Sequence, residues 1–316
     1  MMSFLPKIRT SVFAFIILIL LSVIGCGVIP PPAPTPEPKL EPTVTSTTEK
    51  LKVHFIDVGD GDSVLIDLDE TEILIDGGLP RSGVARYLND YVDGSLEVMV
   101  ATHPHPDHIG GLIKVLETFD VEEIYLNGDT FPGKGRSFAI FKKFTSLVEA
   151  EGASTHEARR GQTIDVGILS CYVLHPDTLL PYSAFQRIPS IFHIGNNNSI
   201  VLRLRYGNIA FLFAGDAYTE AEASILKAGL DVRADILKVG HHGSKSSSSR
   251  QFLNAVRPKV AGYMATGKIG GSGPKKPHPN TIAALKKTGA QVYGTQTHGT
   301  IVITTDGETY AIDTQK

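Results

Sequence analysis

The chain has 316 residues, of which 42% are apolar and 20% charged, a composition that excludes a disordered protein. Its formal net charge of -3 provides no overall attraction to a polyanion, so a nucleic acid would have to be held by a local basic patch or by metal ions. The length exceeds one average domain of about 150 residues, but layered α/β folds can use more than about 200 residues as one unit.

The N-terminus carries an apolar run, Val12 to Gly25, which follows Lys7 and Arg9 and ends at Cys26. The four residues from Val23 to Cys26, Val-Ile-Gly-Cys, resemble the lipobox of bacterial lipoproteins. Residues 1–26 are therefore predicted to be a lipoprotein-type signal peptide, with lipidation of Cys26 anchoring an exported, extracytoplasmic protein to the membrane. The alternative is an uncleaved signal-anchor helix, although the run is shorter than the roughly 20 residues that span a bilayer.

Residues 27–50 are rich in proline and threonine and poor in apolar side chains. Prolines favour an extended polyproline backbone of about 3.1 Å per residue. This segment is predicted to be a linker between the membrane anchor and a single folded domain at 51–316.

The domain is expected to begin with short strands at 53–56, 63–66 and 72–75, separated by Gly and Asp turns. Helical spacing predicts helices at 82–92, 109–119 and 137–150, with a strand at 96–101. Further strands are expected at 168–174, 200–204, 209–213, 236–239, 260–265, 301–303 and 310–312, and further helices at 220–227, 249–256 and 281–287. This mixture predicts an α+β fold of two packed mixed sheets with helices outside and functional loops at one sheet edge.

Four possible metal ligands lie within six residues, directly after the strand at 96–101: His103, His105, Asp107 and His108. Imidazole and carboxylate together suit zinc, iron or manganese better than calcium. Two prolines between the histidines fix the backbone and hold it extended, which gives the imidazoles a set direction. The segment predicts a transition-metal site; the alternative is a polar loop with solvated histidines.

Two later segments also place a possible ligand at a strand end. Asp216 follows the apolar strand at 209–213, and His241 follows the strand at 236–239. A Gly-Asp pair after a strand is by itself usually a turn, but the ordered set of motifs indicates a metal centre in which Asp216 could bridge two ions.

These motifs, with the segments 57–63, 74–78 and 197–202, resemble the metallo-β-lactamase superfamily, and within it the hydrolase domain of ComEC/Rec2-type DNA-uptake proteins. The resemblance covers nearly all of 51–316. It implies a four-layered αββα sandwich with two divalent metal ions, zinc or manganese, at its edge. His103 and His105 would bind one ion, Asp107, His108 and His241 the other, and Asp216 would bridge them.

The resemblance also implies residues that support the ligands. Asp76 would accept a hydrogen bond from a ligating histidine, and the alternative is a turn aspartate before two glycines. Asn198 belongs to an Asn-rich segment that stands where the superfamily usually has a third histidine for the first metal. An oxygen donor there suits manganese better than zinc.

For catalysis, Asp107 is expected to orient the attacking water or accept its proton, and His278 to protonate the leaving group or contact the phosphate. A surface histidine before a proline is the alternative for His278. His242 and Ser244 lie in a loop rich in Gly and Ser and are expected to contact the substrate, unless this loop is simply solvated. No aromatic residues are interleaved there that would stack on single-stranded bases.

The expected function is that of a membrane-tethered, metal-dependent phosphodiesterase or nuclease acting on a phosphodiester polymer such as DNA. Many zinc β-lactamases have a cysteine where this chain has Asp216, which argues against antibiotic hydrolysis. Three alternatives remain open: a phosphodiesterase acting on envelope polymers such as phosphorylcholine-bearing teichoic acid, a non-catalytic DNA-binding module, and a redox di-iron protein.

Overall fold

The computed structural model describes residues 49–185, 191–266 and 276–316. The predicted signal segment 1–26, including Cys26, lies outside the described residues, as does nearly all of the linker 27–50. Within the described ranges, every helix is too short or too polar to cross a membrane.

The described strands form two mixed sheets. The first consists of β1 (Leu51–Phe55), β2 (Val64–Leu68), β3 (Thr71–Ile75), β4 (Leu96–Ala101), β5 (Val121–Leu126), β6 (Ser154–Glu157), β14 (Ile301–Thr305) and β15 (Tyr310–Thr314). The second consists of β7 (Thr163–Val166), β8 (Leu169–His175), β9 (Val201–Tyr206), β10 (Ile209–Phe213), β11 (Ile236–Lys238), β12 (Val260–Tyr263) and β13 (Gln291–Gly294). Their spatial orders are β15-β14-β1-β2-β3-β4-β5-β6 and β13-β12-β11-β10-β9-β8-β7.

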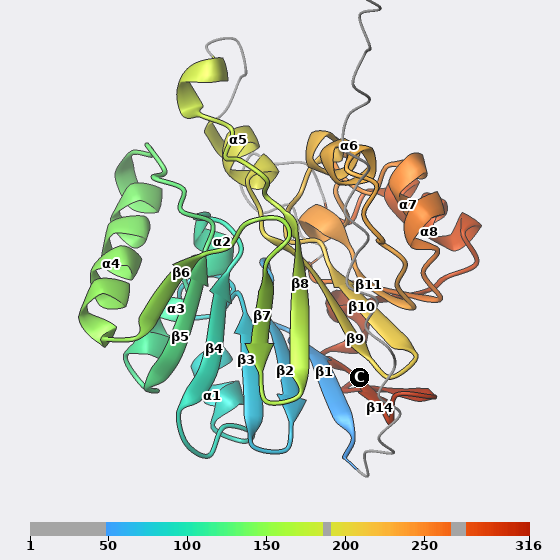
Figure 1. Ribbon diagram of the computed structural model, residues 1–316, viewed down its shortest axis with the longest axis horizontal. Coiled ribbons are helices and arrows are strands. Elements are labelled where there is room, and N and C mark those ends of the chain that lie inside the picture. The colour runs from blue at the N-terminus through green and yellow to red at the C-terminus, as the bar shows by residue number, and fades with distance from the viewer. Residues whose placement is uncertain (1–48, 186–190, 267–275) are drawn as a thin grey trace, which may run out of the picture. The chain divides into compact units, whose positions relative to one another are not determined.

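Helices cover the outer face of each sheet (Figure 1). The first sheet carries α1 (Val84–Leu88), α2 (Pro106–Ile109), α3 (Leu112–Leu116) and α4 (Gly135–Glu151), and the second carries α6 (Thr219–Lys227), α7 (Arg250–Val256) and α8 (Pro279–Lys287). The remaining helical segments are η1 (Tyr182–Phe185), α5 (Ile191–Asn197), η2 (Gly240–Gly243) and α9 (Thr295–His298).

Three layers of buried apolar side chains hold the four structural layers together. Phe55 and Phe211 belong to the cluster between the two sheets. Leu74 belongs to the cluster under α1 to α4, and Leu237 and Phe252 to the cluster under α6 to α8. Each fully buried side chain of this size contributes about 1.5–3 kcal/mol of hydrophobic free energy. The predicted α+β fold, an αββα sandwich, is confirmed.

The strand directions gather many loops at one edge of the sandwich. β3, β4 and β5 run parallel, and so do β10, β11 and β12. β2 and β9 run antiparallel to β3 and β10, so they start where those strands end. The loops before β2 and β9 therefore meet those after β3, β4, β10 and β11. We call this the site edge; α5 lies at it, at the top of Figure 1.

The helix-covered face of the first sheet also carries a row of charged side chains, of which Asp67 and Glu72 are buried. Lys52 pairs with Asp67 at 3.3 Å, and Asp67 lies opposite Glu72 in the strand register. Glu72 is 1% exposed, and its backbone N–H donates to Glu97 at 2.7 Å. Burial and, after it, the negative charge of Glu97 raise the pKa of Glu72 to about 8, with smaller contributions from Asp67 and Asp93.

This row predicts that stability falls as the pH rises. The folded protein holds a proton on Glu72 up to about pH 8, whereas the unfolded chain releases it near the usual pKa of 4.5. The contribution of the Glu72 proton to the free energy of unfolding is therefore fully present below about pH 4.5 and is lost towards pH 8. Glu72→Gln keeps the neutral shape, so it should reduce this slope and stabilise the protein by about 1–2 kcal/mol at pH 8. Urea unfolding at pH 5, 6.5 and 8 measures both effects.

The control is Glu122→Gln, the same substitution at an exposed position of β5. It should leave the slope of wild type unchanged. An unaltered slope in Glu72→Gln would show that Glu72 is ionised in the folded protein.

Candidate metal centre

The predicted ligands come together at the site edge from both sheets, and with them Asp62 and His242, which were not predicted as ligands. Asp62 precedes β2, and His103 to His108 follow β4. From the second sheet, Asp216 follows β10 and the pair His241-His242 follows β11. Residues separated by more than a hundred positions in the sequence thus lie in one cluster.

Four buried side chains form the centre of this cluster: Asp62, His108, Asp216 and His242. Each offers one ligand atom, and these atoms lie within 4.8 Å of one another. Nε2 of His108 and Nε2 of His242 are each 3.3 Å from Oδ2 of Asp216. Both nitrogens, and Oδ1 of Asp216, are buried without a hydrogen-bond partner. Unsatisfied buried nitrogen and oxygen atoms that converge in this way fit a divalent metal ion.

A second group lies beside the first. Nε2 of His103 and Nδ1 of His105 are 2.9 Å apart, and both residues are buried. Nε2 of His103 is also 4.0 Å from Oδ2 of Asp216. The Asp216 carboxylate therefore faces both groups, as a bridging ligand would.

One buried carboxylate orients a histidine in each group. Asp76 accepts hydrogen bonds from Nδ1 of His108 at 2.7 Å and from the hydroxyl of Thr102 at 2.7 Å. The same hydroxyl lies 3.0 Å from Nδ1 of His103, from which it can accept. In the neutral form that binds metal, this network places the ring protons of His103 and His108 on Nδ1, so that both Nε2 lone pairs face the cluster. The structure thus places Asp76 in the contact expected from the sequence.

The segment η2 turns two successive histidines into the cluster. His241 and His242 have φ angles of 46° and 54°, in the left-handed region that residues other than glycine rarely adopt. Such conformations cost about 1–3 kcal/mol each and gather at functional sites. Nδ1 of His242 bonds Oδ1 of Asp62 at 3.0 Å, and Nδ1 of His241 bonds the Ser246 hydroxyl at 2.6 Å. Both rings therefore direct Nε2 towards Asp216.

His242 lies closer to the centre of the cluster than His241, whereas the sequence predicts His241 as the metal ligand and His242 as a substrate contact. Nε2 of His242 lies 3.5 Å from Asp107 as well as 3.3 Å from Asp216. His241 lies outside the group of four, with Nε2 at 3.8 Å from Asp216. The sequence cannot distinguish adjacent histidines because the left-handed turn decides which ring points where.

Asp62 and Lys238 are site residues that the sequence analysis did not single out. Lys238 is 2% exposed and donates to Oδ2 of Asp62 and, at 2.9 Å, to the carbonyl of Gly215. Asp62 is thereby held between the lysine and His242. Burial, and after it the positive charge of Lys276, lowers the pKa of Lys238 well below its usual value, whereas the adjacent Asp62 carboxylate acts in the opposite direction. The available signals were the segment 57–63, whose resemblance to the family includes Asp62, and a lysine inside an apolar strand.

Burial and charge set the protonation of the other groups. Burial lowers the pKa of His103 well below its usual value and that of His105 to about 4, so both rings are neutral, as metal ligands must be. Burial alone would raise the pKa of Asp216, but the neighbouring His242 and His108 outweigh it and hold this pKa well below its usual value.

Three other predicted residues lie around the cluster. Asn198 accepts from the Leu180 N–H at 2.8 Å and donates to Asp129 at 3.0 Å, so it holds neighbouring loops together. Ser244 accepts from the Ser246 hydroxyl at 3.1 Å and so belongs to the network behind His241. His278 caps α8 by accepting from the Asn280 N–H at 3.2 Å.

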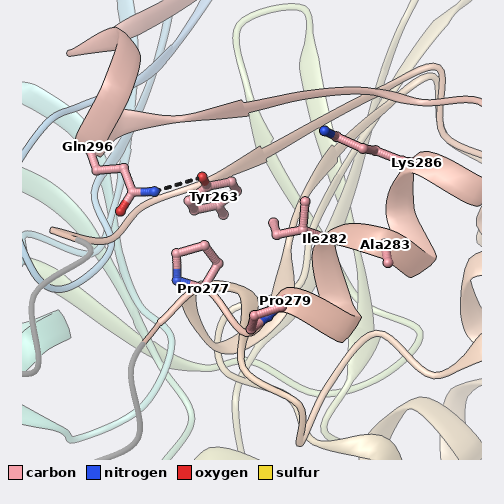
Figure 2. Close-up of a pocket in the computed structure, with 7 residues that line it drawn as sticks. All are labelled: Tyr263, Pro277, Pro279, Ile282, Ala283, Lys286 and Gln296. Carbon is pink, nitrogen blue, oxygen red and sulfur yellow. Dashed lines mark hydrogen bonds between the residues drawn. The ribbon is translucent and has the colours of Figure 1, made fainter.

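A hollow of about 480 Å³ lies behind η2, lined by Tyr263, Pro277, Pro279, Ile282, Ala283, Lys286 and Gln296 (Figure 2). Gln296 donates to the Tyr263 hydroxyl at 3.1 Å. Pro277 packs against Gly243, where a Cβ would lie 2.8 Å from the Cβ of the proline. None of the proposed ligands lines this hollow, so it is separate from the metal centre.

Comparison with known proteins agrees with this geometry. Residues 56–265 match the metallo-beta-lactamase superfamily. ComE operon protein 3 of Bacillus subtilis (strain 168) is 27% identical over 79% of this chain and 32% of its own length. Competence protein ComA of Neisseria gonorrhoeae is 31% identical over 65% of this chain and 26% of its own length. The solved metallo-beta-lactamase fold protein YhfI from Bacillus subtilis superposes with a TM-score of 0.52 at 14% identity, covering 80% of this chain and 99% of that one.

Two packed sheets with a cluster of histidines and aspartates at one edge are the architecture of a metallo-hydrolase. The chain belongs to the metallo-β-lactamase superfamily. It spans 32% and 26% of the length of ComE operon protein 3 and ComA, and the likeness to YhfI concerns the fold alone.

Proposed function

We propose that the protein is a metal-dependent phosphodiesterase that cleaves DNA with two divalent ions, zinc or manganese. The observation that carries this proposal is Asp216, a buried carboxylate that faces histidines of both groups. A bridging carboxylate suits a site with two ions about 3.5–4 Å apart, the arrangement used for phosphodiester cleavage.

In this proposal His103 and His105 hold one ion, Asp107, His108 and His242 hold the other, and Asp216 lies between them. When bound, the ions would lower the pKa of water and neutralise charge on the phosphate oxygens. His241 lies close enough to Asp216, at 3.8 Å, to adjust that carboxylate or to contact the substrate.

Asp107 is the proposed proton acceptor. Its side chain is 30% exposed, whereas those of Asp62, Asp76 and Asp216 are almost fully buried, so water reaches Asp107 most readily. Nearby His242 and His108 outweigh the effect of burial and hold the pKa of Asp107 well below its usual value, so the carboxylate is ionised. His278, whose N–H bonds Gly243 at 2.9 Å, is the proposed donor to the leaving group.

The proposal also includes the polymer that is cleaved and the anchoring of the protein to the membrane. One relative is named a competence protein, and the sequence resembles the hydrolase domain of DNA-uptake proteins, which supports DNA as the polymer substrate. Lipidation of Cys26 would hold the domain outside the membrane on the linker 27–50.

The proposal predicts metal-dependent hydrolysis that requires Asp107. The full chain, stripped of metal and refilled with manganese or zinc, should hydrolyse bis-p-nitrophenyl phosphate and single-stranded DNA, and Asp107→Ala should lose activity by about 100-fold or more. The stripped protein is the control for adventitious nuclease. Bound metal without turnover on either substrate would instead indicate another ester substrate or a binding role.

A further inference from the structure

An aromatic ring lies exposed beside the metal centre. In the part of the chain that the structure describes, the exposed large apolar side chains are Leu79, Phe138, Ile168 and Phe192. Phe192 is 43% exposed, and its ring centroid lies 5.0 Å from that of His105, a proposed metal ligand. Its ring is therefore both partly accessible to solvent and next to a proposed ligand, as an aromatic side chain that stacks on a bound base has to be.

The ring of Phe192 packs against a buried aromatic ring, that of Phe131. Phe131 is fully buried, and its ring lies 5.8 Å from His105 and 5.9 Å from Phe192. The three rings form one cluster in which Phe192 is outermost. It is therefore a supported surface, as a stacking platform requires.

The backbone of α5 is seated directly on the metal centre. A Cβ at Gly195 would lie 2.6 Å from Nε2 of His105, so only glycine lets the helix approach this closely. The side chain of Asn197 accepts from the Ala221 N–H at 3.2 Å, and Nε2 of His193 lies 3.1 Å from Glu220. Both contacts tie α5 to the start of α6, which holds Phe192 at a set distance from the ligands.

Building on the proposed function, we propose that Phe192 stacks on a nucleobase next to the scissile phosphodiester. A base is one sugar away from its phosphate. A flat π-system therefore lies close to any DNA phosphate bound at the metal centre. Base–aromatic stacking is worth about 1–3 kcal/mol per base and tolerates any sequence. In a duplex the faces of a base are covered by its neighbours, so the platform selects single-stranded DNA.

The arrangement does not suit a phosphorylcholine group. Quaternary ammonium ions are recognised by several aromatic faces that surround them. Here Phe131 is buried beneath Phe192, so a ligand meets the exposed surface of only one ring of this cluster.

The test compares two oligonucleotides that share the same phosphates: a fluorescent single-stranded oligonucleotide with bases and its abasic counterpart. Binding to the full chain is measured by fluorescence anisotropy with the manganese-loaded protein and strands that carry cleavage-resistant phosphorothioate linkages, and cleavage with ordinary strands. Phe192→Ala should weaken binding of the base-containing strand about 5- to 100-fold and raise its KM similarly, with kcat little changed. The abasic strand should respond equally to wild type and variant.

Two further variants complete the design. Phe192→Trp keeps a stacking face and should retain binding of the base-containing strand. Ile168→Ala removes an apolar side chain that is 64% exposed, in the turn between β7 and β8, and should change nothing. Circular dichroism checks that each variant is folded.

Equal losses on both strands would overturn the inference, because Phe192 would then act by supporting His105. No loss on either strand would overturn it as well. Failure of the proposed function looks different: wild type would cleave neither strand, whereas selective loss of base-dependent binding in Phe192→Ala would still support stacking on DNA.

Discussion

Asp216→Asn should lower kcat/KM for phosphodiester hydrolysis by more than about 100-fold and reduce the metal that the protein retains. Substituting residues that merely orient metal ligands costs about 10- to 100-fold in affinity or activity, and Asp216 lies closer to the centre than those. Its Oδ2 is within 4.0 Å of ring nitrogens of His103, His108 and His242. The amide removes the negative charge that both ions would share.

Metal content after dialysis and kcat/KM with manganese or zinc measure the two effects. Asp231→Asn is the matched control, because this aspartate is 43% exposed and pairs with Arg203 away from the site edge. It should behave as wild type. Full activity with full metal content in Asp216→Asn would exclude a bridging role for this carboxylate.

Lys238→Met should lower the free energy of unfolding by about 3–5 kcal/mol, because breaking a buried ion pair leaves a charge without compensation. The uncompensated group is Asp62, which is 2% exposed and keeps its contact with His242, with His108 at 4.0 Å. Methionine has nearly the length of lysine without its charge, so lost packing is a small part of the effect. Urea unfolding in the presence of a chelator measures the change without interference from bound metal.

The double variant Lys238→Met/Asp62→Asn should lose less than the sum of the two single variants, since it removes both buried charges. The control is Lys259→Met, whose ammonium is 67% exposed and pairs with Asp235 at 2.8 Å; it should cost no more than about 1 kcal/mol. Additive losses at Lys238 and Asp62 would show that the two groups do not depend on each other.

The sequence predicts elements of this fold where a run of apolar residues is long or periodic. The expected strand at 209–213 matches β10, and the expected helix at 137–150 lies within α4. The strand β6 escaped prediction because all four of its residues are exposed at the border of the sheet, so no apolar alternation marks it. The helix expected at 109–119 is divided between α2 and α3, where Gly111 lies so close to Gly77 that a Cβ would be 1.9 Å from its carbonyl oxygen.

The site residues also divide into those that are neighbours in the sequence and those that only the fold brings together. The histidines at 103, 105 and 108 can be recognised together because they are neighbours along the chain. Asp62 and Lys238 are 176 positions apart, and only the packing of two sheets makes them partners. Phe192 resembles any loop aromatic until α5 places it against His105.

Each half of the chain supplies a different part of the proposed ligand set. The loops of the first sheet carry His103, His105, Asp107 and His108, and those of the second carry Asp216 and His242. Metal bound at this edge would act as a cross-link between the two sheets, and any separation of the sheets there would break the ligand set and release it. Resistance of the sandwich to opening and occupancy of its metal centre are therefore linked equilibria, and each favours the other.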